Sequence, residues 1–198
     1  MNKNEIIRVF FLPVYKPVKG ITLLIRNKKK LAYSVLVFLF LGVIYTISVQ
    51  LAYIKGIRPS VTPFINIPVE NYYYWQRFWQ VPLFFVTSIV FTGIVRLFAY
   101  TRNGKGNFVD LFCIVSAAQT FPMFITMWVP ETIGFIFFSG SYMPVIVDIL
   151  RQVIGIIWPL AIIIKGITIS EEINLFYSLL FTIIASIPMT VLMVVFIR

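Results

Sequence analysis

The chain has 198 residues, of which 60% are apolar and only 12% are charged, with 17 Lys and Arg against 7 Asp and Glu. A soluble domain carries about a quarter charged residues, so this composition excludes a soluble enzyme, a disulfide scaffold and a disordered chain. The chain has no His, and Cys113 is its single cysteine. Histidine catalysis, histidine metal sites and an intrachain disulfide are therefore excluded, and we expect no cofactor.

The first 30 residues form a basic amphipathic segment that we expect to lie on the membrane surface. Apolar residues repeat at i, i+4 spacing within 5–27, and Pro13 and Pro17 must interrupt a helix there, which predicts two short helices joined by a bend. The segment is either an anchor for the first span or a surface for a cytoplasmic protein partner, and its composition favours the anchor. Because no RNA-binding motif accompanies them, its basic residues should contact anionic lipid headgroups rather than nucleic acid: Arg8, Lys16, Lys19, Arg26, Lys28, Lys29 and Lys30.

Five apolar stretches follow, each of a length that suits the roughly 30 Å core of a bilayer. They lie near 31–54, 81–100, 108–129, 145–164 and 173–197. The expected fold is all-α: an integral membrane bundle of five transmembrane helices over 31–198, preceded by the surface segment 1–30. The apolar stretch 132–144 is too short to cross alone, so we expect an extension of the third helix followed by an interfacial or re-entrant turn.

The distribution of Lys and Arg predicts how the bundle is oriented. Eight of the 17 basic residues precede the first span, and the 101–107 and 165–172 connections carry three more. On the opposite side, residues 55–80 carry three and the 130–144 loop carries none. Basic connections stay in the cytoplasm. We therefore expect a multi-pass protein of the cell membrane with a cytoplasmic N-terminus and an external C-terminus.

The connection before the second span is rich in aromatic residues. Six of them fall within 72–79, namely Tyr72, Tyr73, Tyr74, Trp75, Phe78 and Trp79. An aromatic belt at the outer membrane interface explains most of this cluster. The alternative is a lid over a cavity between the helices.

Charged residues inside the spans are costly and should be paired. Arg96 and Asp110 flank the short second connection, and we expect them to form a structural salt bridge within this hairpin. Asp148, Arg151 and Gln152 lie on one face of the fourth span. Two interpretations of this second group stay open.

In the first interpretation, Arg151 is neutralised by Asp148 and by Glu131 in a structural clasp. In the second, an externally open pocket holds a lipid headgroup or a small polar solute, with Arg151 as the anion contact. Gln119 would lie below that pocket, and Tyr73 and Trp75 would lie above it.

Glu171 and Glu172 resemble the paired glutamates of intramembrane CAAX-type proteases, but no Arg follows at helical spacing and the chain has no His. A simpler interpretation is that they follow an N-cap at Ser170 and place negative charge at the start of the fifth helix. We expect no catalytic residues.

Several motifs, in order, resemble the Yip family of polytopic membrane proteins, which interact with Ypt/Rab GTPases. They are Pro17-Val18-Lys19-Gly20 with Asn27-Lys28-Lys29-Lys30, the turn Gly104-Lys105-Gly106-Asn107-Phe108, Pro122, and Gly155-Ile156-Ile157-Trp158 followed by Lys165-Gly166-Ile167 and Ser170. The short N-terminal arm is closer to prokaryotic members, and Ala117-Ala118-Gln119 replaces the Gly-Tyr pair of many members.

The resemblance implies a five-span fold and a non-enzymatic role in membrane organisation or trafficking, through lipid, a protein partner or a second copy of the chain. The alternative is a small transporter or a lipid- or solute-binding protein. The transporter interpretation rests on the polar residues of the third and fourth spans and not on the family resemblance.

Overall fold

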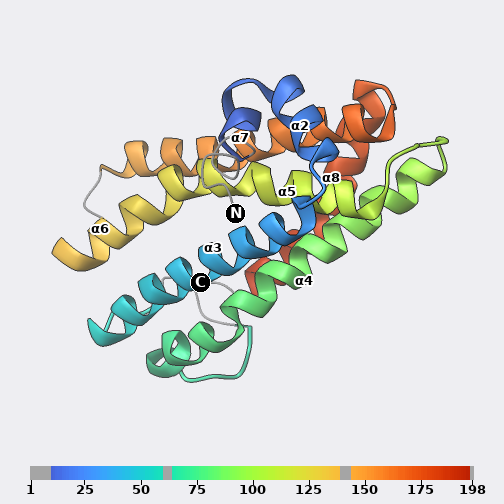
Figure 1. Ribbon diagram of the computed structural model, residues 1–198. Coiled ribbons are helices and arrows are strands. Elements are labelled where there is room, and N and C mark those ends of the chain that lie inside the picture. The colour runs from blue at the N-terminus through green and yellow to red at the C-terminus, as the bar shows by residue number, and fades with distance from the viewer. Residues whose placement is uncertain (1–9, 60–63, 139–143, 197–198) are drawn as a thin grey trace.

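The computed structural model describes residues 10–59, 64–138 and 144–196, and within these ranges it contains helices and no strand. Five stretches are long and apolar enough to cross a membrane: Lys30–Ile54, Val69–Tyr100, Phe108–Phe137, Val145–Glu171 and Leu175–Phe196. They pack into one elongated bundle (Figure 1). The expected all-α bundle of five spans is confirmed, and the chain is a multi-pass helical membrane protein.

Helices α3 (Lys30–Ile54) and α4 (Tyr72–Tyr100) are antiparallel neighbours. The ring of Phe38, in the first half of α3, packs on Phe85 in the middle of α4, and that of Tyr53 at the end of α3 packs on Tyr74 near the start of α4, with ring centroids 5.6 and 5.5 Å apart. The bundle thus has two ends. We call the end with the start of α3 the N-terminal end, and the end with the start of α4 the far end.

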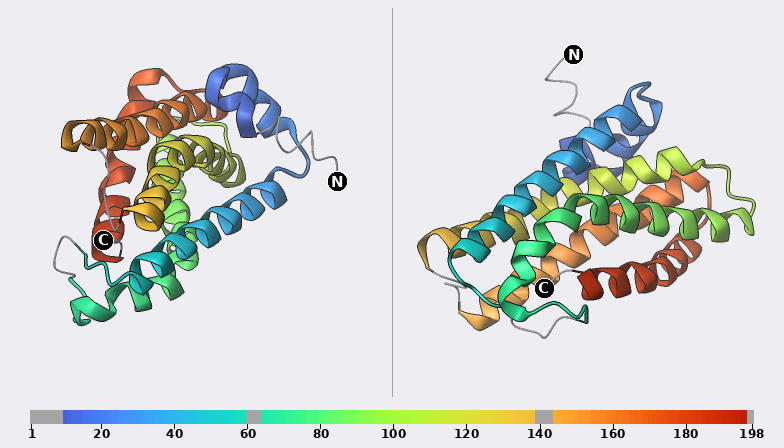
Figure 2. Two further views of the ribbon diagram at one scale, coloured as in Figure 1. Left: turned by 90° about the vertical axis from the view of Figure 1, so that its left-hand side faces the viewer. Right: turned by 90° about the horizontal axis from the view of Figure 1, so that it is seen from below.

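The third span runs through the middle of the bundle. It consists of α5 (Phe108–Met123), the π-helical turn η2 (Phe124–Trp128) and α6 (Val129–Phe137). Every residue in 110–119 is buried, and in Figure 2 this span lies between α3 and α7 (Val145–Glu171). The expected extension of the third helix is confirmed as far as Phe137, whereas the turn expected after it falls largely on 139–143, outside the described residues.

Small residues let the helices approach closely. A Cβ atom on Gly166 of α7 would lie 2.3 Å from Cγ2 of Ile114, and one on Gly42 of α3 would lie 2.8 Å from Cγ2 of Val81. Close backbone approach is the usual way in which membrane helices gain packing energy, because lipid provides no hydrophobic drive for their association. Cys113, as expected, is a buried small residue in this core.

Two helices are longer than the sequence predicts. α4 begins at Tyr72 rather than near 81, because its polar residues are accommodated inside the protein: Gln76 and Gln80 are fully buried, and Nε2 of Gln76 donates to Oε1 of Gln80 at 3.1 Å. α7 continues to Glu171, so Lys165 lies within a helix and not in a connection. Helix α8 (Leu175–Phe196) completes the bundle against α4 and α7.

The N-terminal segment forms the two helical pieces that its prolines predict. Residues 10–15 are helical, Lys16 is a bend, and α2 (Pro17–Arg26) follows. The bend is tight, since a Cβ atom on Gly20 would lie 2.2 Å from the backbone nitrogen of Pro13. Ile21 and Leu24 are fully buried, and α2 packs on α5 and α7. The apolar side of α2 therefore contacts the bundle itself, so the segment is held in a fixed position.

Candidate functional site

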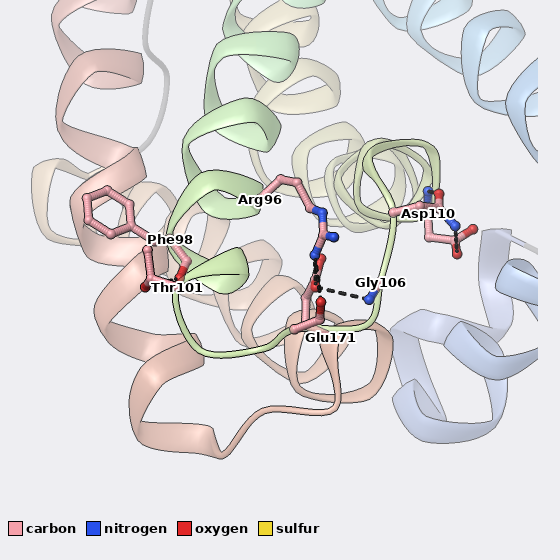
Figure 3. A network of polar contacts seen from close by, with 8 residues as sticks. Arg96, Phe98, Thr101, Gly106, Asp110 and Glu171 are labelled. Carbon is pink, nitrogen blue, oxygen red and sulfur yellow. Dashed lines mark hydrogen bonds and ion pairs between the residues drawn. The ribbon is translucent and has the colours of Figure 1, made fainter.

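Glu171 is the least exposed carboxylate in the part of the chain that the structure describes, since its side chain has no exposed surface. It is the last residue of α7. Nη1 of Arg96 donates to its Oε2 at 2.6 Å, and the backbone N–H of Gly106 donates to the same oxygen at 3.1 Å (Figure 3). Nη1 of Arg96 also donates to the carbonyl of Gly104 at 3.0 Å. One arginine thus connects α4, the turn after it and the end of α7.

The Gly-Lys-Gly turn fits around this carboxylate because two of its residues have no side chain. A Cβ atom on Gly104 would lie 2.5 Å from Oε2 of Glu171, and one on Gly106 would lie 2.7 Å from its Cδ. The backbone N–H of Lys105 donates to the carbonyl of Glu171 at 3.1 Å, and its Nζ lies 2.6 Å from Oε2 of Glu172. The hydrogen bond to Glu172 raises the pKa of Lys105.

The prediction that Glu171 and Glu172 lie at the start of the fifth helix is wrong. Glu171 ends α7, and Glu172 follows it in a left-handed conformation with φ of 54°. Asn174 occupies the capping position instead, since its Oδ1 accepts from the backbone N–H of Tyr177 at 2.9 Å. Negative charge at a helix C-terminus is opposed by the helix dipole, so the position of Glu171 depends on Arg96.

The expected pairing of Arg96 with Asp110 is also wrong, because each has another partner. The guanidinium of Arg96 points to the end of α7, whereas Asp110 lies apart, on the first turn of α5 (Figure 3). Asp110 forms an ion pair with Lys30 and accepts from Nδ2 of Asn107 at 2.7 Å. Lys30 also donates to the carbonyl of Ile25 at 2.8 Å. Lys30, expected at the membrane surface, is therefore a partly buried residue that joins the α2–α3 turn to α5.

At the far end, Asp148, Arg151 and Gln152 are together as their spacing predicts. Nη2 and Nε of Arg151 donate to Oδ1 of Asp148 at 2.6 and 3.0 Å, and Nε2 of Gln152 donates to Oδ2 of Asp148 at 3.0 Å. Nη1 of Arg151 donates to the carbonyl of Thr126, and to that of Met127 at 3.3 Å. This geometry is that of a clasp between α7 and η2.

The π-helical turn explains why carbonyl groups are available to Arg151. Pro130 has no N–H, so the carbonyl of Thr126, four residues earlier, loses its α-helical donor. The turn is wide, with the N–H of Val129 bonded to the carbonyl of Phe124, five residues back. A Cβ atom on Gly155 would lie 2.5 Å from Oγ1 of Thr126, so only a glycine lets α7 come this close.

The other residues of the predicted pocket are spread over the bundle. Glu131 lies within electrostatic reach of Arg151 and Asp148, but none of the ion pairs in the described residues includes it. Gln119 is buried in α5, and Tyr73 is buried at the far end. Trp75 is 47% exposed and packs on Tyr74 and Phe78 of its own helix, with ring centroids 5.4 and 6.1 Å apart. The structure does not bring Trp75 to Arg151.

A set of exposed cations remains at the N-terminal end, and we call it the basic surface. None of its members takes part in an ion pair within the described residues, where the carboxylates of Asp110, Glu171 and Glu172 pair with other cations. Phe11, Tyr15 and Val18 are exposed on the same segment. The basic surface consists of Lys16, Lys19, Arg26, Lys28 and Lys29; Arg8, also expected there, lies outside the described residues.

Comparison with known proteins gives no match to any protein-family model, curated protein or solved structure. Within the described residues, no group of three Cys, Asp and Glu side chains could hold a metal ion. The described residues thus hold three internal ion-paired groups, around Glu171, Asp110 and Asp148, and one basic surface whose cations have no carboxylate partner.

Proposed function

We propose that this protein is a non-enzymatic membrane protein that binds anionic lipid headgroups through its basic surface, in the kind of membrane-organising role that its Yip-like motifs imply. On the bias of Lys and Arg among its connections, this surface faces the cytoplasmic leaflet of the cell membrane. One observation carries the proposal: five exposed cations lie on a segment that is fixed to the bundle and have no carboxylate partner in the described residues.

Fixed geometry strengthens lipid binding, because little side-chain and backbone order has to be created on association. The burial of Ile21 and Leu24 holds α2, and the bond from Lys30 to the carbonyl of Ile25 holds the turn that follows it. Each cation near an anionic surface contributes about 1 kcal/mol. Exposed Phe11, Tyr15 and Val18 provide apolar contacts beside these charges.

The solute-binding or transport alternative rests on Arg151, and the contacts of this side chain favour the clasp. Its Nε, Nη1 and Nη2 atoms all donate to acceptors inside the protein. A ligand anion would have to displace Asp148 or the carbonyls of η2 to reach it.

Electron spin resonance of spin-labelled lipids tests the proposal on the full-length protein in phosphatidylcholine vesicles. The measurement compares the association of spin-labelled phosphatidylglycerol with that of spin-labelled phosphatidylcholine. The variant K19Q/K29Q removes two charges of the basic surface. R102Q/K105Q is the matched control, since it removes two exposed charges at the same end that have partners in the protein: Arg102 lies over the ring of Tyr177 and Lys105 pairs with Glu172.

We expect the wild type and R102Q/K105Q to select phosphatidylglycerol, with a selectivity that falls as salt is added. K19Q/K29Q should lose most of this selectivity. Equal selectivity in K19Q/K29Q and the wild type would contradict the proposal.

A further inference from the structure

Arg77, at the far end of the bundle, is a cation without a carboxylate partner in the described residues. Glu70, the nearest acidic residue in sequence, pairs with Arg58 at 3.6 Å. The guanidinium of Arg77 has one described hydrogen bond, from Nη1 to Oε1 of Gln50 at 2.7 Å. Its Nε is buried without a hydrogen-bond partner. An arginine has five N–H donors. With Nε buried and one donor of Nη1 bonded to Gln50, the Nη2 donors and the second Nη1 donor have no described acceptor.

The guanidinium of Arg77 contacts two aromatic rings of its own helix. Its central carbon lies 4.1 Å from the ring centroid of Tyr74 and 4.7 Å from that of Phe78, both within the range of a cation–π contact. Trp75 packs beside them, and Trp75 and Phe78 are 47% and 59% exposed. A positive, planar donor group therefore lies next to an exposed apolar surface.

The position of Arg77 along α4 places this group at the level of lipid headgroups. It lies in the second turn of the helix, and the uncharged stretch 78–95 begins directly after it. Tyr and Trp concentrate at the same level because their rings suit the boundary between hydrocarbon and water.

We propose that Arg77 binds the phosphodiester of a membrane phospholipid whose glycerol and upper acyl chain pack on Trp75 and Phe78. Two phosphate oxygens match the spacing of a guanidinium fork, which favours Arg at such sites. The exposed rings of Trp75 and Phe78 favour a lipid over free phosphate, because free phosphate would leave both rings without an apolar contact. This site lies at the opposite end of the bundle from the basic surface and does not depend on the proposed function.

Native mass spectrometry of the full-length protein, titrated with phospholipid in mild detergent, tests this site. Dioleoylphosphatidylglycerol and dioleoylphosphatidylcholine both carry the phosphodiester, dioleoylglycerol lacks it, and inorganic phosphate lacks the chains. The variant R77Q removes the guanidinium group. R58Q is the matched control, since it removes an arginine near the same end whose side chain is 69% exposed and paired with Glu70.

We expect dioleoylphosphatidylcholine, which the basic surface does not select, to bind the wild type and R58Q, with R77Q about tenfold weaker or more, as is typical when a charge-assisted hydrogen bond is lost. Dioleoylphosphatidylglycerol should still bind R77Q at the basic surface. Dioleoylglycerol should bind weakly to all three proteins, and inorganic phosphate should not displace the phospholipid. If R77Q fails to fold, W75A decides the question, because Trp75 has its described ring contacts within its own helix. The proposal would be overturned if dioleoylphosphatidylcholine bound R77Q as tightly as the wild type, or bound W75A as tightly where R77Q does not fold. Displacement by phosphate would also overturn it.

Discussion

The variant R96Q should destabilise the protein through an effect on Glu171. With the guanidinium removed, the Glu171 carboxylate keeps the N–H of Gly106 but loses its counter-charge in a position without solvent exposure. Breaking a buried ion pair on one side costs about 3–5 kcal/mol. Since the Arg96 side chain is 27% exposed, we expect the lower end of that range, about 3 kcal/mol.

The assay is thermal unfolding in detergent, followed by intrinsic tryptophan fluorescence. For a chain of this size, a loss of about 3 kcal/mol lowers the midpoint by roughly 6–12 °C. The double variant R96Q/E171Q should recover much of this loss, because neither partner is then an unpaired charge. K105Q/E172Q is the control, since that pair is exposed and contributes little. A midpoint for R96Q within about 1 °C of wild type, which corresponds to well under 1 kcal/mol, would refute the reasoning.

Three further predictions use the same assay. R151Q should lower stability by about 3 kcal/mol with or without added phospholipid, and a variant that loses only lipid-induced stabilisation would show a pocket instead of a clasp. G166A should cost about 1–3 kcal/mol because its Cβ meets Ile114, whereas G93A, which meets nothing within 4 Å, should be neutral; equal losses would contradict the packing argument. K30Q and D110N should each destabilise, and the double variant should lose little more than one of them; fully additive losses would show that the two residues are not partners.

The spans could be predicted from the sequence because a bilayer imposes one requirement on every helix, a long apolar stretch without unpaired charges. The grouping of Asp148, Arg151 and Gln152 could be predicted for a similar reason, since i, i+3 and i+4 positions share a helix face. These inferences depend only on local spacing.

The partners of Arg96 and Asp110 could not be predicted in this way, because they come from helices distant in sequence. The sequence places the two residues on neighbouring helices, but it does not reveal that the end of α7 reaches the turn at 101–107. One signal was present: two glycines around Lys105 indicate close approach to the backbone, and the structure shows that Glu171 is the group that approaches.

Hydropathy does not predict the continuation of α4 before 81, because Gln76, Arg77 and Gln80 are polar. The structure buries both glutamines and bonds Arg77 to Gln50 of α3. The glutamines bond to each other within α4, whereas Arg77 bonds across to a neighbouring helix. Hydropathy along one chain segment cannot show either contact.

The depth of α2 in the membrane tests the central proposal most directly. A nitroxide at Val18→Cys, which is 53% exposed on α2, can be compared with one at Arg102→Cys, an exposed position in the turn after α4. Cys113 is buried and should not react. In vesicles with anionic lipid, we expect the probe at 18 to be more accessible to oxygen than to a water-soluble nickel complex, and the probe at 102 to show the reverse. A probe at 18 that is as accessible to the nickel complex as the probe at 102 would contradict the binding of this surface to lipid headgroups.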